Sequence, residues 1–197
     1  DSDEAHRLRG NALLDLGRAG EAIEEFRAAV AIRSGYWRNH ARLGFAFYRT
    51  GRFDVAAAAF RRATELQPDN ASTFQMLGSM YHAVGDTARA LENYKRALER
   101  APNAQTSANT HSNIGSIHYD AGRFEQAVAS FQEAVKLRPK EPHYYRMLGK
   151  AYQHQGRSAD ARASFERAVE LLEGLLRVNP RDARSLEGGF DRKLWKR

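Results

Sequence analysis

The chain has 197 residues, a formal net charge of +7 and no cysteine. The absence of cysteine excludes disulfide bonds, thiolate catalysis and zinc sites built on cysteine. No run of about 18 apolar residues occurs, so we expect a soluble protein without membrane insertion. The composition does not determine the compartment, although we favour the cytoplasm over the periplasm or secretion.

Glycine recurs along the chain at a nearly constant interval. Members of one set are separated by 34, 34, 37 and 34 residues, and each is followed by alanine five positions later and by an aromatic residue nine positions later. A glycine of a second set precedes each member by seven positions. Five copies of one pattern indicate a repeat protein, in which each unit packs against its neighbours. The first set is Gly17, Gly51, Gly85, Gly122 and Gly156, and the second is Gly10, Gly44, Gly78, Gly115 and Gly149.

Each unit is predicted to be a pair of antiparallel helices, which is clearest in the second unit. Residues 37–49 should form a first helix, Gly51 should end it and turn the chain, and residues 53–66 should form a second helix before Pro68. Glycine and alanine at the contact allow the two helix backbones to approach closely, and Phe60 fills the remaining space. The sequence therefore predicts an all-α solenoid of helix hairpins with a concave surface.

The units follow one another as a single array over residues 1–187. Three extra residues near 105–107 are predicted to lengthen the turn between the third and fourth units. The fifth unit carries seven additional residues, or two helical turns, so its second helix should run long with Leu171, Leu172, Leu175 and Leu176 on its apolar stripe. The units span about 3–36, 37–70, 71–104, 108–141 and 142–180, and a partial sixth helix and a basic tail over 188–197 follow.

The tail over 188–197 has two interpretations. It is either a native or artificial extension with no structural role, or a cap in which Phe190, Leu194 and Trp195 fold back over the last hairpin. Only a cap would make the melting temperature fall when the chain is shortened to end before Phe190.

The second unit contains, in order, Leu43, Gly44, Phe47, Gly51, Ala56, Phe60, Ala63 and Pro68. This order resembles the tetratricopeptide repeat family, and the resemblance covers about residues 3–180. It implies a right-handed superhelical solenoid and a non-catalytic scaffold that binds a peptide or protein segment in a groove lined by the first helix of each unit. The groove residues that the resemblance implies are Arg7, Asn11, Arg38, Arg42, Phe45, Tyr48, Arg49, Gln75, Ser79, His82, Asn109, Asn113, Ser116, Tyr119, Arg146 and Lys150.

Positive charge gathers at both ends of the predicted groove. Arg38, Arg42 and Arg49 are separated by four and seven residues on one helix, so they should share a face, with Arg7 beside them. Arginine attracts carboxylates and forms paired hydrogen bonds with them, which predicts an acidic peptide as the ligand. The alternative is that these arginines are simply solvated.

No catalytic motif is found in the sequence. The phosphate-binding patterns GxGxxG and GxxxxGK[ST] and the nucleophile pattern GxSxG do not occur, so we expect neither enzymatic activity nor a cofactor. His111 and His118 share a helix face, but both occupy aromatic packing positions of the repeat. This placement favours packing over a metal site.

Other functions stay open from the sequence. The net charge of +7 is compatible with nucleic-acid binding, although 24 acidic residues are interleaved with the basic ones and the tail supplies part of the excess. A start without methionine is compatible with a regulatory or sensing arm of a larger multidomain enzyme. Exposed apolar faces of the terminal repeats could support self-association.

Overall fold

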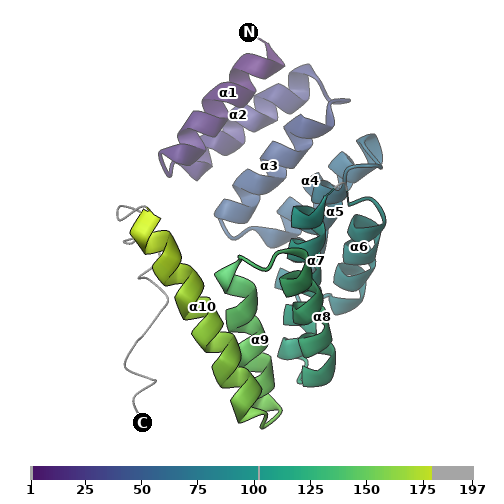
Figure 1. The fold of residues 1–197 in the computed structure, drawn as a ribbon. Helices are drawn as coiled ribbons and strands as arrows, with labels where there is room; N and C mark the ends of the chain where they lie inside the picture. The colour runs from purple at the N-terminus through teal and green to yellow at the C-terminus, as the bar shows by residue number, and fades with distance from the viewer. Residues whose placement is uncertain (1, 102, 179–197) are drawn as a thin grey trace.

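The structure is a computed structural model that describes residues 2–101 and 103–178, and these residues form ten α-helices (Figure 1). The helices pack as five consecutive hairpins, which confirms the predicted all-α hairpin repeat. We call the first helix of each hairpin an A helix and the second a B helix. The A helices are α1 (Asp3–Asp15), α3 (Trp37–Arg49), α5 (Ala71–Ala83), α7 (Ala104–Asp120) and α9 (Pro142–His154). The B helices are α2 (Ala19–Ile32), α4 (Phe53–Leu66), α6 (Thr87–Glu99), α8 (Phe124–Leu137) and α10 (Ser158–Val178).

The hairpins stack in chain order into a curved array that begins with α1 and ends with α10 (Figure 1). Each B helix contacts the A helix of its own hairpin, and α2, α4, α6 and α8 also contact the A helix that follows. One hairpin alone would leave an apolar face in water, so the stack buries that face unit by unit.

A glycine with left-handed backbone forms the turn inside each hairpin. Gly51 has a φ of 73°, and its N–H donates to the carbonyl of Tyr48 while the N–H of Arg52 donates to the carbonyl of Phe47. Residues with a Cβ rarely adopt this φ, which explains why glycine stands at this point of every unit. The predicted end of the first helix before Gly51 is confirmed.

The second glycine of each unit lies where the two helices of a hairpin approach each other. A Cβ on Gly115 would lie 2.6 Å from Cε1 of Phe131, whose ring is fully buried. The corresponding contacts are 2.7 Å at Gly10 and 3.0 Å at Gly44. The ring and the glycine therefore interlock, as the sequence predicts for an aromatic residue facing a small one.

The three extra residues near 105–107 extend a helix, so the prediction of a longer turn is wrong. They lie inside α7, which has 17 residues where the other A helices have 13. Asn103 caps α7 by accepting a hydrogen bond from the N–H of Thr106 at 3.0 Å, and Thr106 is buried. Three residues are nearly one helical turn, so α7 starts earlier without rotating its buried face.

The predicted long helix of the fifth unit is confirmed. α10 has 21 residues, whereas α2, α4 and α8 have 14 each. Leu171, Leu172 and Leu176 are half-buried, while Leu175 is 50% exposed. None of the described helices is long and apolar enough to cross a membrane. The predicted partial sixth helix, the tail over 188–197 and the capping residues Phe190, Leu194 and Trp195 lie outside the described residues.

Candidate functional site

A pocket of about 500 Å³ opens at the first three hairpins, between the A helices α1, α3 and α5. Arg7 of α1 and Arg38 and Arg42 of α3 line it, and no carboxylate of the described residues does. The arginines sit beside apolar and neutral polar walls, which is the composition of a site for an anionic group attached to an apolar one. The other lining residues are Trp37, Ala41, Phe45, Phe60, Asn70, Ser72, Thr73 and Met76.

The pocket contains only part of the predicted basic patch. Arg49 follows two turns after Arg42 on α3 and does not line the pocket. Three of the four predicted arginines therefore line the same pocket, and Arg49 lies outside it. Of all the predicted groove residues, the pocket brings together Arg7, Arg38, Arg42 and Phe45.

Aromatic residues extend from the pocket along α3. The ring of Tyr48 is 41% exposed and lies 5.9 Å from the ring of Phe45 and 6.1 Å from that of Phe53. Trp37 lines the pocket, although it is not among the predicted groove residues. Its position at the start of α3, next to Arg38, is the sequence signal from which Trp37 could have been predicted as a pocket residue.

The two arginines of α3 in the pocket differ in their partners. Arg38 donates to the hydroxyl of Tyr36 at 2.7 Å, and its guanidinium carbon lies 5.1 Å from the ring centroid of Trp37. Arg42 is exposed and forms no ion pair with a described carboxylate. Arg42 is therefore free to pair with an incoming anion.

Arg7 and Asn11 lie one turn apart on α1 and have polar atoms without partners. Nη2 of Arg7 lies 3.6 Å from the carboxylate of Glu4. Nε of Arg7 and Oδ1 of Asn11 are both buried, with no hydrogen-bond partner among the described residues. Buried polar atoms usually find a partner, so these two atoms depart from the usual pattern.

Three of the seven predicted groove residues in the middle of the array make a polar contact with another helix, and they are Ser79, His82 and Asn109. The hydroxyl of Ser79 lies 3.0 Å from that of Tyr94, which reaches it from α6. His82 of α5 contacts Asp120 of α7, with Nε2 3.2 Å from Oδ2. These contacts hold adjacent helices together and leave fewer free polar groups at the centre.

Two predicted groove residues of α7, Ser116 and Asn109, also have hydrogen-bond partners, and that of Ser116 lies within α7 itself. Ser116 donates to the carbonyl of Ser112 at 3.1 Å, and Asn109 accepts hydrogen bonds from the hydroxyl of Tyr144 and the amide of Gln105. In contrast, the side-chain amides of Gln75 on α5 and Asn113 on α7 are half-buried and make no hydrogen bond within the described residues. The middle of the predicted groove therefore keeps two neutral amides for a ligand.

Tyr119, the predicted groove residue near the end of α7, belongs to an aromatic cluster. Its ring centroid lies 5.6 Å from that of Phe124 and 5.3 Å from that of His154. Phe124 and His154 stack at 4.7 Å with an interplanar angle of 13°. The cluster joins α7, α8 and α9 through ring contacts.

Arg146 and Lys150 place positive charge on α9. Nη2 of Arg146 lies 3.3 Å from Nδ1 of His143, and Lys150 is exposed. Neither cation forms an ion pair with a carboxylate of the described residues, and α9 itself contains none. Partial burial lowers the pKa of His143, and the positive charge of Arg146 lowers it further by a smaller amount. The neutral form of His143 is therefore favoured beside these cations.

Ion pairing distinguishes the A helices after α1 from the B helices, whereas Arg7 and Arg9 of α1 pair with Glu4 and Glu25. α3, α5, α7 and α9 together contain a single carboxylate, Asp120, and their five lysines and arginines pair with no described acidic residue. On the B helices, by contrast, seven cations pair with a carboxylate three or four residues away. These pairs are Arg27–Glu24, Arg62–Glu65, Arg89–Asp86, Arg96–Glu92, Lys136–Glu133, Arg162–Glu166 and Arg167–Glu170.

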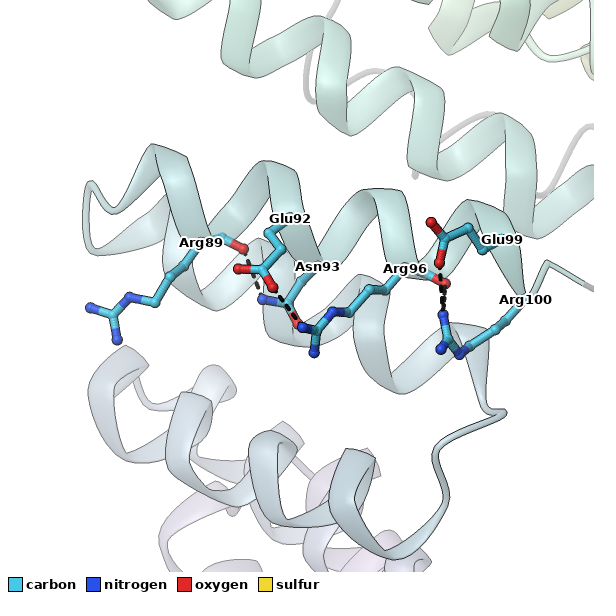
Figure 2. A network of polar contacts seen from close by, with 6 residues as sticks. All are labelled: Arg89, Glu92, Asn93, Arg96, Glu99 and Arg100. Carbon is cyan, nitrogen blue, oxygen red and sulfur yellow. Dashed lines mark hydrogen bonds and ion pairs between the residues drawn. The ribbon is translucent and has the colours of Figure 1, made fainter.

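Figure 2 shows such pairing along α6. Arg96 reaches Glu92 at 2.6 Å, and Arg100 reaches Glu99 at 3.2 Å. Asn93 donates to the carbonyl of Arg89 in the same row. Each of these charges is matched by a neighbour, so this face has little remaining attraction for an anion.

All seven histidines lie on A helices. Desolvation lowers the pKa of His111, and although the carboxylate of Glu133 raises it slightly, burial has the larger effect. Desolvation and then Arg123 lower the pKa of His118. No group of three or more histidine or acidic side chains in residues 2–101 and 103–178 could hold a metal ion.

We expect the His111→Phe variant to lose less stability in acid than the wild type. Because the folded pKa of His111 is lowered, the unfolded chain takes up its proton first, and stability falls as the pH drops below the ordinary histidine value of about 6.5. Phe74, at the equivalent position of the third unit, is 5% exposed, so phenylalanine should fit. The expected gain is about 1 kcal/mol at pH 7 and larger at pH 5.5. Thermal melts between these pH values test this, and an equal loss in both proteins would contradict it.

These hairpins, interlocked by glycine and an aromatic ring, define a helical-repeat protein with a basic pocket on its A helices. Two tetratricopeptide repeat profiles match the chain, one over residues 38–103 and 69–140 and the other over residues 1–36 and 113–174. The chain belongs to the tetratricopeptide repeat family. Proteins of this family generally act as protein-interaction scaffolds.

Relatives of the chain agree with this family. It is 31% identical over 64 residues to the small glutamine-rich tetratricopeptide repeat-containing protein 2 of Saccharomyces cerevisiae, a match that covers 32% of this chain and only 18% of that protein. MamA from Desulfovibrio magneticus RS-1 has the same fold, with a TM-score of 0.76, 20% identity and coverage of 88% and 97% of the two chains. MamA AMB-1 gives a TM-score of 0.67 at 27% identity, over 86% and 98% of the chains.

Proposed function

We propose that this protein is a non-catalytic scaffold that binds an acidic peptide or protein segment along its A helices. One observation carries the proposal: the cations of α3 and α9 have no carboxylate partner among the described residues, whereas most cations of the B helices have one. Unpaired arginines can form charge-assisted, bidentate hydrogen bonds with carboxylates of a partner. Most B-helix cations already make such an ion pair with a carboxylate of their own helix.

The pocket places apolar side chains beside these cations. Trp37, Phe45 and Met76 supply apolar walls next to Arg38 and Arg42. A segment that combines an acidic side chain with an apolar one would therefore find both contacts in one place. Arg7 of α1 adds a third arginine to the lining of the pocket.

Nucleic acid fits this surface less well. A single strand places one phosphate at every nucleotide and requires cations along its whole path. α5 and α7 contain neither lysine nor arginine, so the middle of the surface offers no partner for those phosphates. A peptide can carry carboxylates only where the surface offers cations, whereas a nucleic-acid strand carries a phosphate at every nucleotide.

A direct binding measurement tests the proposal. Fluorescence anisotropy would compare a labelled peptide of glutamate, serine and glycine, with the glutamates spread evenly, with the same peptide carrying lysine and with an oligothymidine of similar length. We expect only the glutamate peptide to bind well, and to bind roughly tenfold more weakly when salt rises from about 0.05 to 0.5 M. Equal or tighter binding of oligothymidine at about 0.2 M salt would reverse the choice of ligand.

A further inference from the structure

Apart from Arg9, which pairs with Glu25, and Arg49, which does not line the pocket, the lysines and arginines of the A helices lie in two separate groups. The first group is Arg7 of α1 with Arg38 and Arg42 of α3, which share the pocket. The second is Arg146 and Lys150 of α9. α5 and α7, which lie between α3 and α9 in the stack, contain no lysine or arginine. Positive charge is therefore present at two places along the array with a gap between them.

Both groups belong to the same face of the repeat. Arg146 and Lys150 are the fifth and ninth residues of α9, and Ala41 and Phe45 are the fifth and ninth residues of α3. Ala41 and Phe45 line the pocket, so their positions face the surface that the A helices share. Because the units repeat the same hairpin, Arg146 and Lys150 face that surface too.

The gap between the groups disfavours negative charge in a ligand. Asp120 is the only carboxylate on α5 and α7, and it is held by His82 at 3.2 Å. A ligand carboxylate placed here would meet Asp120 and no lysine or arginine. Gln75 and Asn113 offer free amides instead, which suit the backbone of a neutral segment.

The length of the gap follows from the packing of helices. The path from α3 to α9 crosses α5 and α7 and so includes three helix-to-helix steps. At about 8–10 Å for each step, the two cation groups are roughly 25–30 Å apart. An extended chain covers about 3.3 Å per residue, so about eight residues bridge that distance.

We infer that the ligand is a bipartite acidic segment, with two acidic clusters separated by about eight neutral residues in an extended conformation. This inference rests on the proposed function and specifies its ligand. One cluster pairs with Arg38 and Arg42, and the other with Arg146 and Lys150. The neutral spacer crosses α5 and α7, and binding at both ends raises the affinity because the second contact becomes intramolecular.

Three peptides of identical composition test the inference. The first has three glutamates at each end of eight alternating serines and glycines, the second has all six glutamates together in the centre, and the third separates the two triplets by only two residues. Net charge and length are equal, so non-specific attraction is the same for all three. We expect the first peptide to bind at least about tenfold more tightly than the other two.

Variants of the protein show whether both ends are used. Arg146→Glu/Lys150→Glu should weaken binding of the first peptide about tenfold and reduce its advantage over the centred peptide to nothing. Arg61→Glu/Lys95→Glu, on the B helices α4 and α6, makes the same change in net charge and should preserve that advantage. Equal affinity for all three peptides would overturn the bipartite ligand and keep the acidic-ligand function. If none of the peptides binds, both proposals fail.

Discussion

Replacing Arg38 and Arg42 by glutamate should reduce the affinity for an acidic peptide by about a hundredfold, since each reversed charge in the pocket costs about 1.5 kcal/mol of binding free energy. Both arginines line the pocket, and Arg42 has no carboxylate partner in the described residues. The variant replaces two attractions with two repulsions at the same site. Anisotropy titrations at low salt measure the change.

This charge reversal should have little effect on folding. Arg38 and Arg42 are exposed, and the substitutions remove chiefly the hydrogen bond from Arg38 to Tyr36 and its cation–π interaction with Trp37. These two interactions contribute about 1 kcal/mol, so the melting temperature should fall by no more than about 4 °C. Circular dichroism checks helical content and melting together.

The control for this variant is Arg61→Glu/Lys95→Glu, which changes the net charge equally on the B helices. Neither Arg61 nor Lys95 pairs with a described carboxylate, so no internal ion pair is broken. Screening limits the reach of these charges to about 10 Å at 0.1 M salt, and we expect the affinity to change less than about threefold. A pocket variant that still binds like the wild type would place the binding surface elsewhere, first at Arg146 and Lys150.

Gly115→Ala should destabilise the protein by about 2 kcal/mol, although alanine is the better helix former. Its Cβ would lie 2.6 Å from Cε1 and 2.8 Å from Cδ1 of Phe131, closer than non-bonded carbons can approach. Phe131 is fully buried in the core and cannot move aside without disturbing its neighbours. We expect the melting temperature to fall by about 4–8 °C.

Two other glycines provide matched comparisons. Gly174 lies inside α10 with no atom within 4 Å of an added Cβ, so Gly174→Ala should stabilise the protein by about 0.5–1 kcal/mol. At Gly44 the nearest atom of Phe60 is 3.0 Å away, so Gly44→Ala should cost less than Gly115→Ala. The double variant Gly115→Ala/Phe131→Leu should recover part of the lost stability, because leucine is smaller than phenylalanine and leaves room for the added Cβ. A Gly115→Ala protein as stable as the wild type would show that the ring yields, contrary to the interlocking described above.

The sequence predicts the fold well because its signals are local and repeated. Glycine at the turn is required by a positive φ, and glycine at the contact is required by a ring 2.6–3.0 Å from its missing Cβ. Both requirements recur in each unit, so the period of the chain reveals them. The boundaries of α3 and α4 agree with the predicted helices at 37–49 and 53–66.

The insertion near 105–107 shows the limit of such signals. A few extra polar residues between two units can lengthen a loop or a helix, and composition does not distinguish these outcomes. The deciding contacts are the cap from Asn103 to Thr106 and the burial of Thr106 against the array. These extra residues have no equivalent in the other units, so the repeat pattern cannot predict their conformation.

The number of hairpins, the helix face of each residue and the excess of positive charge on α3 and α9 can all be predicted from the sequence, because the spacing of residues along a helix places their side chains. Which polar groups remain free for a ligand depends instead on contacts between helices. Ser79 is bonded to Tyr94, Asn109 to Tyr144 and His82 to Asp120, while Arg42 has no such partner among the described residues. These pairs join residues 15 to 38 positions apart in the chain, and their formation depends on how the hairpins stack.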